Sequence, residues 1–79
     1  MKIQILGSGC PKCQTLERLA REAISEAGIN AEIEKITDID QIMSMGVMMT
    51  PALAIDGKVK SVGKILPKEQ IIEKIKEEL

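Results

Sequence analysis

Two cysteines are the residues of this chain with the clearest chemical potential. Cys10 and Cys13 are the only cysteines among the 79 residues, and Pro11 and Lys12 separate them. They follow a glycine-rich turn at residues 7–9, and an amphipathic helical pattern begins at them. Two thiols at this spacing, between a strand and a helix, are placed for reversible disulfide exchange. The alternatives are inert packing, binding of Cu(I), or binding of Zn²⁺ shared between two chains.

The two cysteines are predicted to have different roles. The N-terminus of a helix exposes unpaired amides and the positive end of its dipole, which together stabilise an anion by about 0.3–2 kcal/mol. Cys10 lies at that end and Lys12 adds a cation, so we expect Cys10 to be an exposed nucleophile with a lowered pKa. Cys13 is in line with the apolar positions Leu16 and Ala20. It is predicted to be the more buried, resolving thiol.

The elements around the cysteine pair follow from hydrophobic periodicity. Apolar, β-branched segments predict strands at residues 2–6, 29–36, 52–55 and 58–62. Helical stripes predict one helix from the cysteines to Gly28 and a short one between Asp38 and Gly46. A last helix is predicted from Pro67, with a buried face made of Ile71, Ile72, Ile75 and Leu79.

The order of these elements is β-α-β-α-β-β-α, which predicts a single α/β domain over residues 1–79. The helical crossover makes the first two strands parallel, and the Asp56-Gly57 turn makes the last two antiparallel. Charged residues suit edge strands, and they mark the second and fourth strands: Glu32, Glu34, Lys58 and Lys60. The sequence therefore predicts a four-stranded mixed sheet in the order 2-1-3-4, flanked by helices.

Thr50-Pro51 before the third strand and Val62-Gly63 before the last helix complete a pattern that resembles the thioredoxin superfamily. The resemblance covers essentially the whole chain. It is nearest to glutaredoxins and to the small thioredoxin-like proteins called redox-active disulfide proteins. It implies a minimal thioredoxin fold, a cis peptide bond before Pro51 that faces the cysteine pair, and pairing of the Thr50 backbone with an extended substrate segment.

The predicted site follows from this resemblance and from neighbouring residues. Cys10 and Cys13 are predicted to be catalytic. Met48 and Met49 precede the proline, where their soft side chains suit either core filling or an apolar contact with a protein substrate. The predicted substrate-binding residues are Pro11, Lys12, Met49, Thr50, Pro51 and Gly63.

Several positions depart from the family patterns. Thioredoxins have Trp where this chain has Gly9, and a buried Asp that helps to move the resolving thiol's proton where it has Gln4. Gln4 cannot act as a base and the chain has no His, so the proton of Cys13 must leave through water or another group. Cys10-Pro11 is similar to glutaredoxins, which have Tyr at the position of Lys12 and Gly-Gly where this chain has only Gly63.

The resemblance implies a disulfide reductase that acts on protein substrates and needs neither a bound cofactor nor a metal. Its electrons are expected from an external donor, either a thioredoxin-reductase-like enzyme or a glutathione-based one, and we expect a monomer. The absence of aromatic residues and the net charge of -1 argue against nucleic acid as a partner. No run approaches the ~20 apolar residues of a membrane span, and the N-terminus lacks a signal-peptide core, so we expect no membrane partner and a cytoplasmic location.

Overall fold

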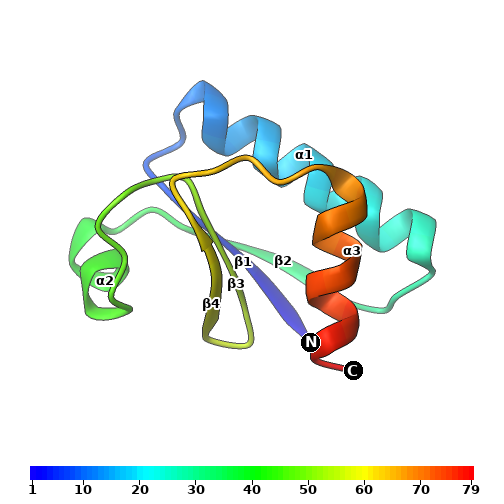
Figure 1. Cartoon of the computed structure of the whole chain (residues 1–79). Coiled ribbons are helices and arrows are strands. Elements are labelled where there is room, and N and C mark those ends of the chain that lie inside the picture. Colours follow the sequence, from blue (N-terminus) through cyan, green and yellow to red (C-terminus); the bar gives the residue numbers. More distant parts are fainter.

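Seven elements build the protein, in the order predicted from the sequence (Figure 1). The structure, a computed structural model, describes all residues from 1 to 79. Its elements are β1 (Lys2–Leu6), α1 (Pro11–Ala27), β2 (Glu32–Ile36), α2 (Ile39–Ser44), β3 (Ala52–Ile55), β4 (Lys58–Val62) and α3 (Lys68–Glu77). The four strands form one sheet in the order β2-β1-β3-β4, which confirms the predicted α/β fold.

The sheet is mixed, as the connections between its strands require. β1 pairs in parallel with β2 and antiparallel with β3, while β3 and β4 form an antiparallel hairpin. Asp56 and Gly57 join the hairpin with positive φ angles of 50° and 84°, the conformation that a two-residue hairpin turn favours. The charged strands β2 and β4 lie at the two edges, and the apolar strands β1 and β3 lie between them.

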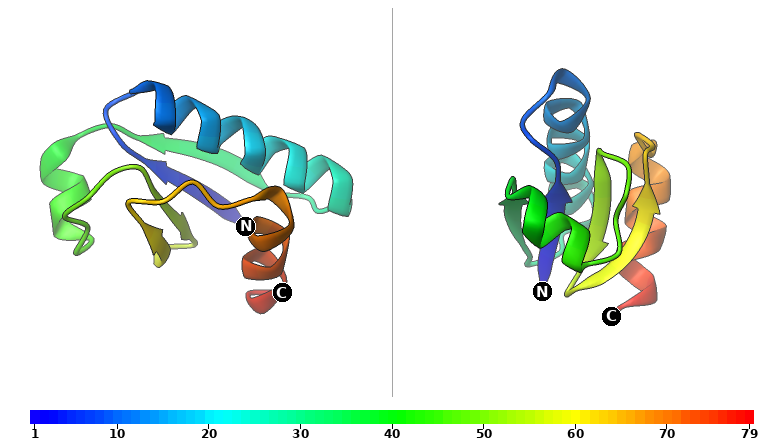
Figure 2. Two further views of the ribbon diagram at one scale, coloured as in Figure 1. Left: turned by 45° about the horizontal axis from the view of Figure 1, so that its top comes forward. Right: turned by 90° about the vertical axis from the view of Figure 1, so that its left-hand side faces the viewer.

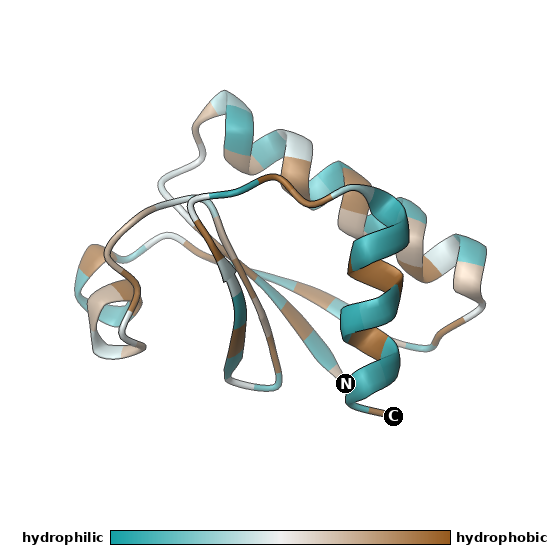
Figure 3. Ribbon diagram, in the orientation of Figure 1, coloured by the Kyte–Doolittle hydropathy of each residue, from teal (hydrophilic) through white to brown (hydrophobic).

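Helices cover both faces of the sheet (Figure 2). α1 and α3 lie together on one face, where they enclose the larger core with residues such as Ile3 and Ile5 of β1. α2 lies apart from them and covers a smaller core that includes Leu6 of β1 and Ile42. Brown apolar bands alternate with teal polar ones along α1 and α3, as expected for helices with one buried face (Figure 3). β1 therefore contributes side chains to both cores, and it leads directly into the cysteine turn.

The end of α1 explains why β2 is shorter than predicted. Gly28 ends the helix in the left-handed conformation, with φ of 66°. The next amide, that of Ile29, donates to the Ile24 carbonyl at 3.1 Å, so Ile29 still belongs to the helix terminus. Strand pairing begins only where Glu32 lies opposite Lys2. The predicted strand at residues 29–36 was therefore wrong at its start.

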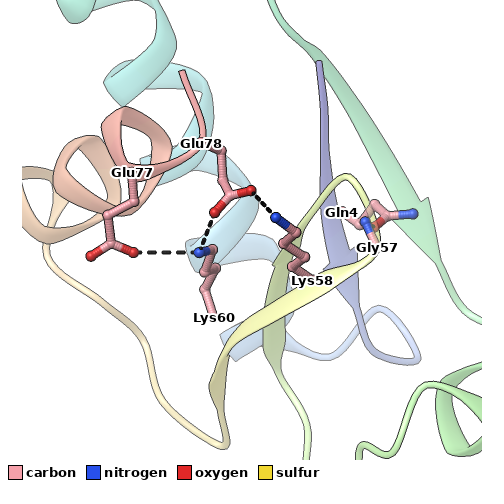
Figure 4. Close-up of polar contacts among 6 residues, drawn as sticks. All are labelled: Gln4, Gly57, Lys58, Lys60, Glu77 and Glu78. Carbon is pink, nitrogen blue, oxygen red and sulfur yellow. Dashed lines mark hydrogen bonds and ion pairs between the residues drawn. The ribbon is translucent and has the colours of Figure 1, made fainter.

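The C-terminal helix also departs from one prediction. Ile71 and Ile75 are fully buried, but Ile72 is only half-buried and Leu79 is 76% exposed. α3 ends at Glu77, so the helical stripe stops before it reaches Leu79. Lys60 of β4 instead holds this end of α3 through ion pairs with Glu77 and Glu78 at 3.3 and 2.7 Å (Figure 4).

Candidate functional site

The cysteine pair lies at the turn between β1 and α1, at the opposite end of the molecule from both termini (Figure 1). Cys10 is the N-cap residue of α1, with φ of -66° and ψ of 165°, and Pro11 occupies the first helical position. The two sulfur atoms lie 2.8 Å apart, within hydrogen-bonding distance. Only a short approach separates the thiols from the ~2.05 Å of a disulfide bond. The pair can therefore interconvert between dithiol and disulfide without a large rearrangement.

The environments of the two thiols differ in the predicted direction. Cys10 is half-buried, whereas Cys13 is only 5% exposed and belongs to the buried stripe of α1. The pKa of Cys10 is lowered, first by the hydrogen bond with the Cys13 thiol and then by the backbone amide of Cys13. The pKa of Cys13 is raised, first by burial and then by its hydrogen bond with Cys10. Cys10 is thus the more readily ionised thiol and Cys13 the one that stays protonated.

The cause of the Cys10 shift differs in part from the sequence argument. Lys12 contributes through its backbone amide, a smaller cause than the Cys13 thiol. Its side chain is exposed and forms no ion pair. The partner thiol is therefore the chief stabiliser of a Cys10 thiolate, and the amides at the helix start assist it.

Gly7 belongs to the candidate site because it lies against Cys13, whereas the sequence predicted only that it forms part of a turn. The residue is buried, and a Cβ atom built on it would collide with Cys13 Sγ. The same Cβ would lie 3.6 Å from the Cβ of Thr50. Gly7 thus stands between the buried thiol and the segment before β3. The sequence shows a glycine three residues before the first cysteine, but only the packing shows that this glycine leaves room for the Cys13 sulfur.

The segment before β3 brings four predicted site residues together. The Thr50–Pro51 peptide bond is cis, and Pro51 is buried while Thr50 is exposed. The Pro51 carbonyl accepts a hydrogen bond of 2.9 Å from the Gly63 amide. Met49 packs against Gly63, where an added Cβ would lie 3.3 Å from the Met49 side chain. Because Gly7 contacts both Thr50 and Cys13, this segment borders the cysteine pair.

Pro11 and Lys12 are not joined to that group by any side-chain hydrogen bond or ion pair. Both are exposed in the first turn of α1. They flank the thiols on the helix side, while Met49, Thr50, Pro51 and Gly63 approach from the sheet side.

An apolar groove begins next to the cysteine turn and runs along α2. Its volume is 240 Å³. Ser8 and Thr50 line the end of the groove near the cysteine turn and the segment before β3, and methionine and aliphatic side chains line the rest: Ile39, Ile42, Met43, Val47 and Met48. Met48 is 82% exposed and Ile39 is 65% exposed, an unusual degree for apolar residues gathered in one place.

Gln4 does not face the cysteines. Its neighbours Ile3 and Ile5 point into the core under α1 and α3, so Gln4 points to the other face of the sheet. There its side chain donates to Glu34 at 3.0 Å and accepts from the Gly57 amide at 2.9 Å (Figure 4 shows Gln4 beside Gly57). A carboxylate at position 4 would therefore also point away from Cys13, so glutamine at this position does not deprive Cys13 of a base.

The fold and the site define a small α/β protein with a thiol pair suited to disulfide exchange. No group of three or more His, Cys, Asp or Glu side chains is arranged to hold a metal ion, which does not favour the metal-binding alternative. None of the three helices has the length and apolar character needed to cross a bilayer.

Comparison with known proteins leads to the same class. Residues 1–76 match the family model described as "Thioredoxin domain". The chain is 54% identical to a thioredoxin of Methanothermobacter thermautotrophicus over 71 residues, which cover 90% of this chain and 92% of the relative. It is 42% identical to a thioredoxin of Methanocaldococcus jannaschii over 74 residues, 94% of this chain and 85% of the relative. The chain belongs to the thioredoxin family, and its cysteine pair supports thiol–disulfide oxidoreductase chemistry in general.

Proposed function

We propose that residues 1–79 form a protein disulfide reductase in which Cys10 attacks and Cys13 resolves. The single observation that carries this assignment is the asymmetry of the pair: a half-buried Cys10 lies 2.8 Å from a Cys13 that is 5% exposed. The Cys10 thiolate attacks one sulfur of a substrate disulfide, and the other sulfur leaves as a thiolate. The Cys13 sulfur then attacks Cys10, which forms the Cys10–Cys13 disulfide and releases the second substrate thiol.

The proposed substrate is an extended segment that pairs with the exposed backbone at Thr50. Strand addition of this kind supplies affinity through main-chain hydrogen bonds and specificity through side-chain pockets. The groove that begins at Ser8 and Thr50 is such a pocket, and its methionines can adapt to apolar side chains of different shapes. Met49 and Gly63 form the other wall of the binding surface.

The oxidised pair must be returned to the dithiol by two electrons from an external donor. We propose a thioredoxin-reductase-like enzyme or a glutathione-based system for this step, since both act by thiol–disulfide exchange. The protein is proposed to work as a monomer in the cytoplasm, where a close cysteine pair serves catalysis more often than structural support.

Reduction of a model protein disulfide, with each donor in turn, tests the assignment. Wild-type protein is expected to turn over with at least one donor. Cys10→Ser is expected to lose activity, and Cys13→Ser to accumulate a mixed disulfide with the substrate, visible by mass spectrometry. Activity that survives in Cys10→Ser would remove Cys10 as the nucleophile, and tight Cu(I) binding without a dithiol cycle would favour the metal alternative.

Met49→Lys tests the apolar contact surface separately from the chemistry. The variant is expected to slow reduction of the model protein while reduction of a small disulfide continues at the wild-type rate. Leu79→Lys is the matched control, because Leu79 is also an exposed apolar residue but lies near the C-terminus, away from the cysteines. An unchanged rate with the protein substrate in Met49→Lys would refute a contact role for this residue.

A further inference from the structure

Cys13 borders a small polar crevice on the side away from Thr50. Its volume is 90 Å³, which accommodates a few water molecules. Its polar wall includes Glu17 from α1, Lys35 from β2 and Thr37, which directly follows β2. Glu17 is four residues after Cys13, so the two side chains lie on the same face of the helix, one turn apart. The buried thiol thus has a route to water and to a carboxylate that does not pass through Cys10.

Two cations hold the carboxylate of Glu17 in place. Arg21 donates to Glu17 Oε2 at 2.8 Å, and Lys35 Nζ lies 3.4 Å from Glu17 Oε1. The Glu17 side chain is only 17% exposed. The pKa of Glu17 is lowered, first by the hydrogen bond from Arg21 and then by the hydrogen bond from Lys35, so the group is ionised at neutral pH. The crevice therefore contains a fixed carboxylate that can accept a proton.

We propose that Glu17, acting through water in this crevice, accepts the proton of Cys13 when Cys13 resolves the mixed disulfide. This proposal rests on the proposed function and names the group that the sequence argument left open. The S–H bond of Cys13 breaks, and its proton passes through water to the carboxylate. The sulfur electron pair forms the bond to Cys10 Sγ, while the bond from Cys10 to the substrate sulfur breaks. The proton returns through water to the released substrate thiolate, so Glu17 ends ionised.

The surroundings of Glu17 and Cys13 are consistent with this route. The charged or titratable groups that face the crevice are Cys13 and Glu17 from α1 and Lys35 from β2, with Arg21 and Cys10 as their direct partners. α3 also packs against α1, but its Lys68 pairs with Glu26 nearer the other end of α1. β1 contributes Ile5, whose side chain is apolar. Glu17 is thus the carboxylate available to the buried thiol.

Stopped-flow reduction of a disulfide that carries two fluorescent thiols separates attack from resolution. The first release depends on substrate concentration and reports Cys10, whereas the second does not and reports Cys13. Glu17→Gln is expected to leave the first phase unchanged and to slow the second about tenfold at neutral pH. This effect is below the ~10²–10⁴-fold contribution of a well-matched base, because two cations make the carboxylate weakly basic. Glu22→Gln, an ion-paired carboxylate of α1 outside the crevice, is the matched control and should match wild type in both phases.

The pH profile of the second phase distinguishes proton transfer from a structural effect. With Glu17 present, resolution is expected to vary little from about pH 6 to 8, because the carboxylate is ionised throughout. In Glu17→Gln only the preformed thiolate can react, so the rate should rise about tenfold per pH unit. Arg21→Gln breaks the same ion pair but keeps the carboxylate, and should resolve at least as fast as wild type.

Two results would overturn the proposal. One is an unchanged second phase and pH slope in Glu17→Gln. The other is an equal loss in Glu17→Gln and Arg21→Gln, which would show that the ion pair acts only by positioning α1. Absence of the first phase in wild-type protein would instead refute the proposed function itself, so the two failures are distinguishable.

Discussion

Replacement of Gly7 by alanine is expected to disturb the cysteine pair directly. The new Cβ would collide with Cys13 Sγ, which leads to one of two outcomes. Either α1 shifts to make room, or the Cys13 side chain rotates and its sulfur leaves the position 2.8 Å from Cys10 Sγ. The backbone of Gly7 does not have a positive φ, so alanine introduces no backbone strain of its own. Any effect therefore reports the collision.

The size of the effect follows from overpacking of a buried site. A shift of α1 should lower the free energy of unfolding by about 1–3 kcal/mol. A chain of 79 residues has only about 4–12 kcal/mol in total, and each kcal/mol corresponds to a fall in Tm of about 4–8 °C. If the sulfur rotates instead, stability changes little. The pKa of Cys10 should then rise toward its ordinary value, because the Cys13 thiol is the main cause of its lowering.

A double-mutant cycle separates the collision from other causes. Urea unfolding and pH-dependent alkylation of Cys10 are measured for Gly7→Ala in the wild-type and Cys13→Ala backgrounds. Without Sγ, the nearest atoms to the new Cβ are at 3.4 and 3.6 Å, which are ordinary contacts. Most of the loss of about 1–3 kcal/mol in the free energy of unfolding should then vanish in the Cys13→Ala background. Gly9→Ala is the control, because its φ of 89° gives a backbone cost of about 1–3 kcal/mol that Cys13→Ala should not relieve. Wild-type stability together with a wild-type Cys10 pKa in Gly7→Ala would refute the reasoning.

Three further outcomes are expected. In Cys13→Ala, the pH dependence of alkylation should show that the pKa of Cys10 is higher than in the wild-type protein, because the Cys13 thiol is the main cause of its lowering. An unchanged pKa would show that the amides at the start of α1 are the main cause of the lowering instead. Lys60→Met leaves Glu78 with Lys58 as its remaining partner and should lower the midpoint of urea unfolding. Arg18→Met, which breaks an exposed pair of 3.8 Å, is the control and should leave the midpoint close to the wild-type value. The pKa values of three carboxyls are lower in the folded protein than the ordinary value of 4.5: Glu17, Glu34 and Glu78. These groups stabilise the protein above pH 4.5, and their contribution is lost as the pH falls through their folded pKa values, so the midpoint of urea unfolding should be lower at about pH 3 than at about pH 7. Equal midpoints at the two pH values would show that these carboxyls are as acidic in the unfolded chain as in the folded one.

The fold could be predicted from the sequence because its signals are local. Alternation in the strands, the apolar stripe of α1 and the Asp56-Gly57 turn each involve residues close together in the chain, and charge on β2 and β4 identified the edges. The predictions were wrong at the ends of elements. The start of β2 depends on a helix-ending hydrogen bond of Ile29, and the exposure of Leu79 depends on where α3 stops.

The cysteine spacing by itself determined that the two thiols are neighbours, because residues three apart at a helix start lie close together in any packing of that helix, and it left disulfide exchange, metal binding and inert packing open. Only the tertiary structure decided what surrounds them. It placed Gly7 between Cys13 and Thr50, joined Gln4 to Glu34 and Gly57, and brought Lys35 of β2 to Glu17 at the crevice beside the buried thiol. These contacts join residues that are far apart in the chain, and their distances are set by the pairing of strands and the docking of α1. No periodicity within a single element encodes them.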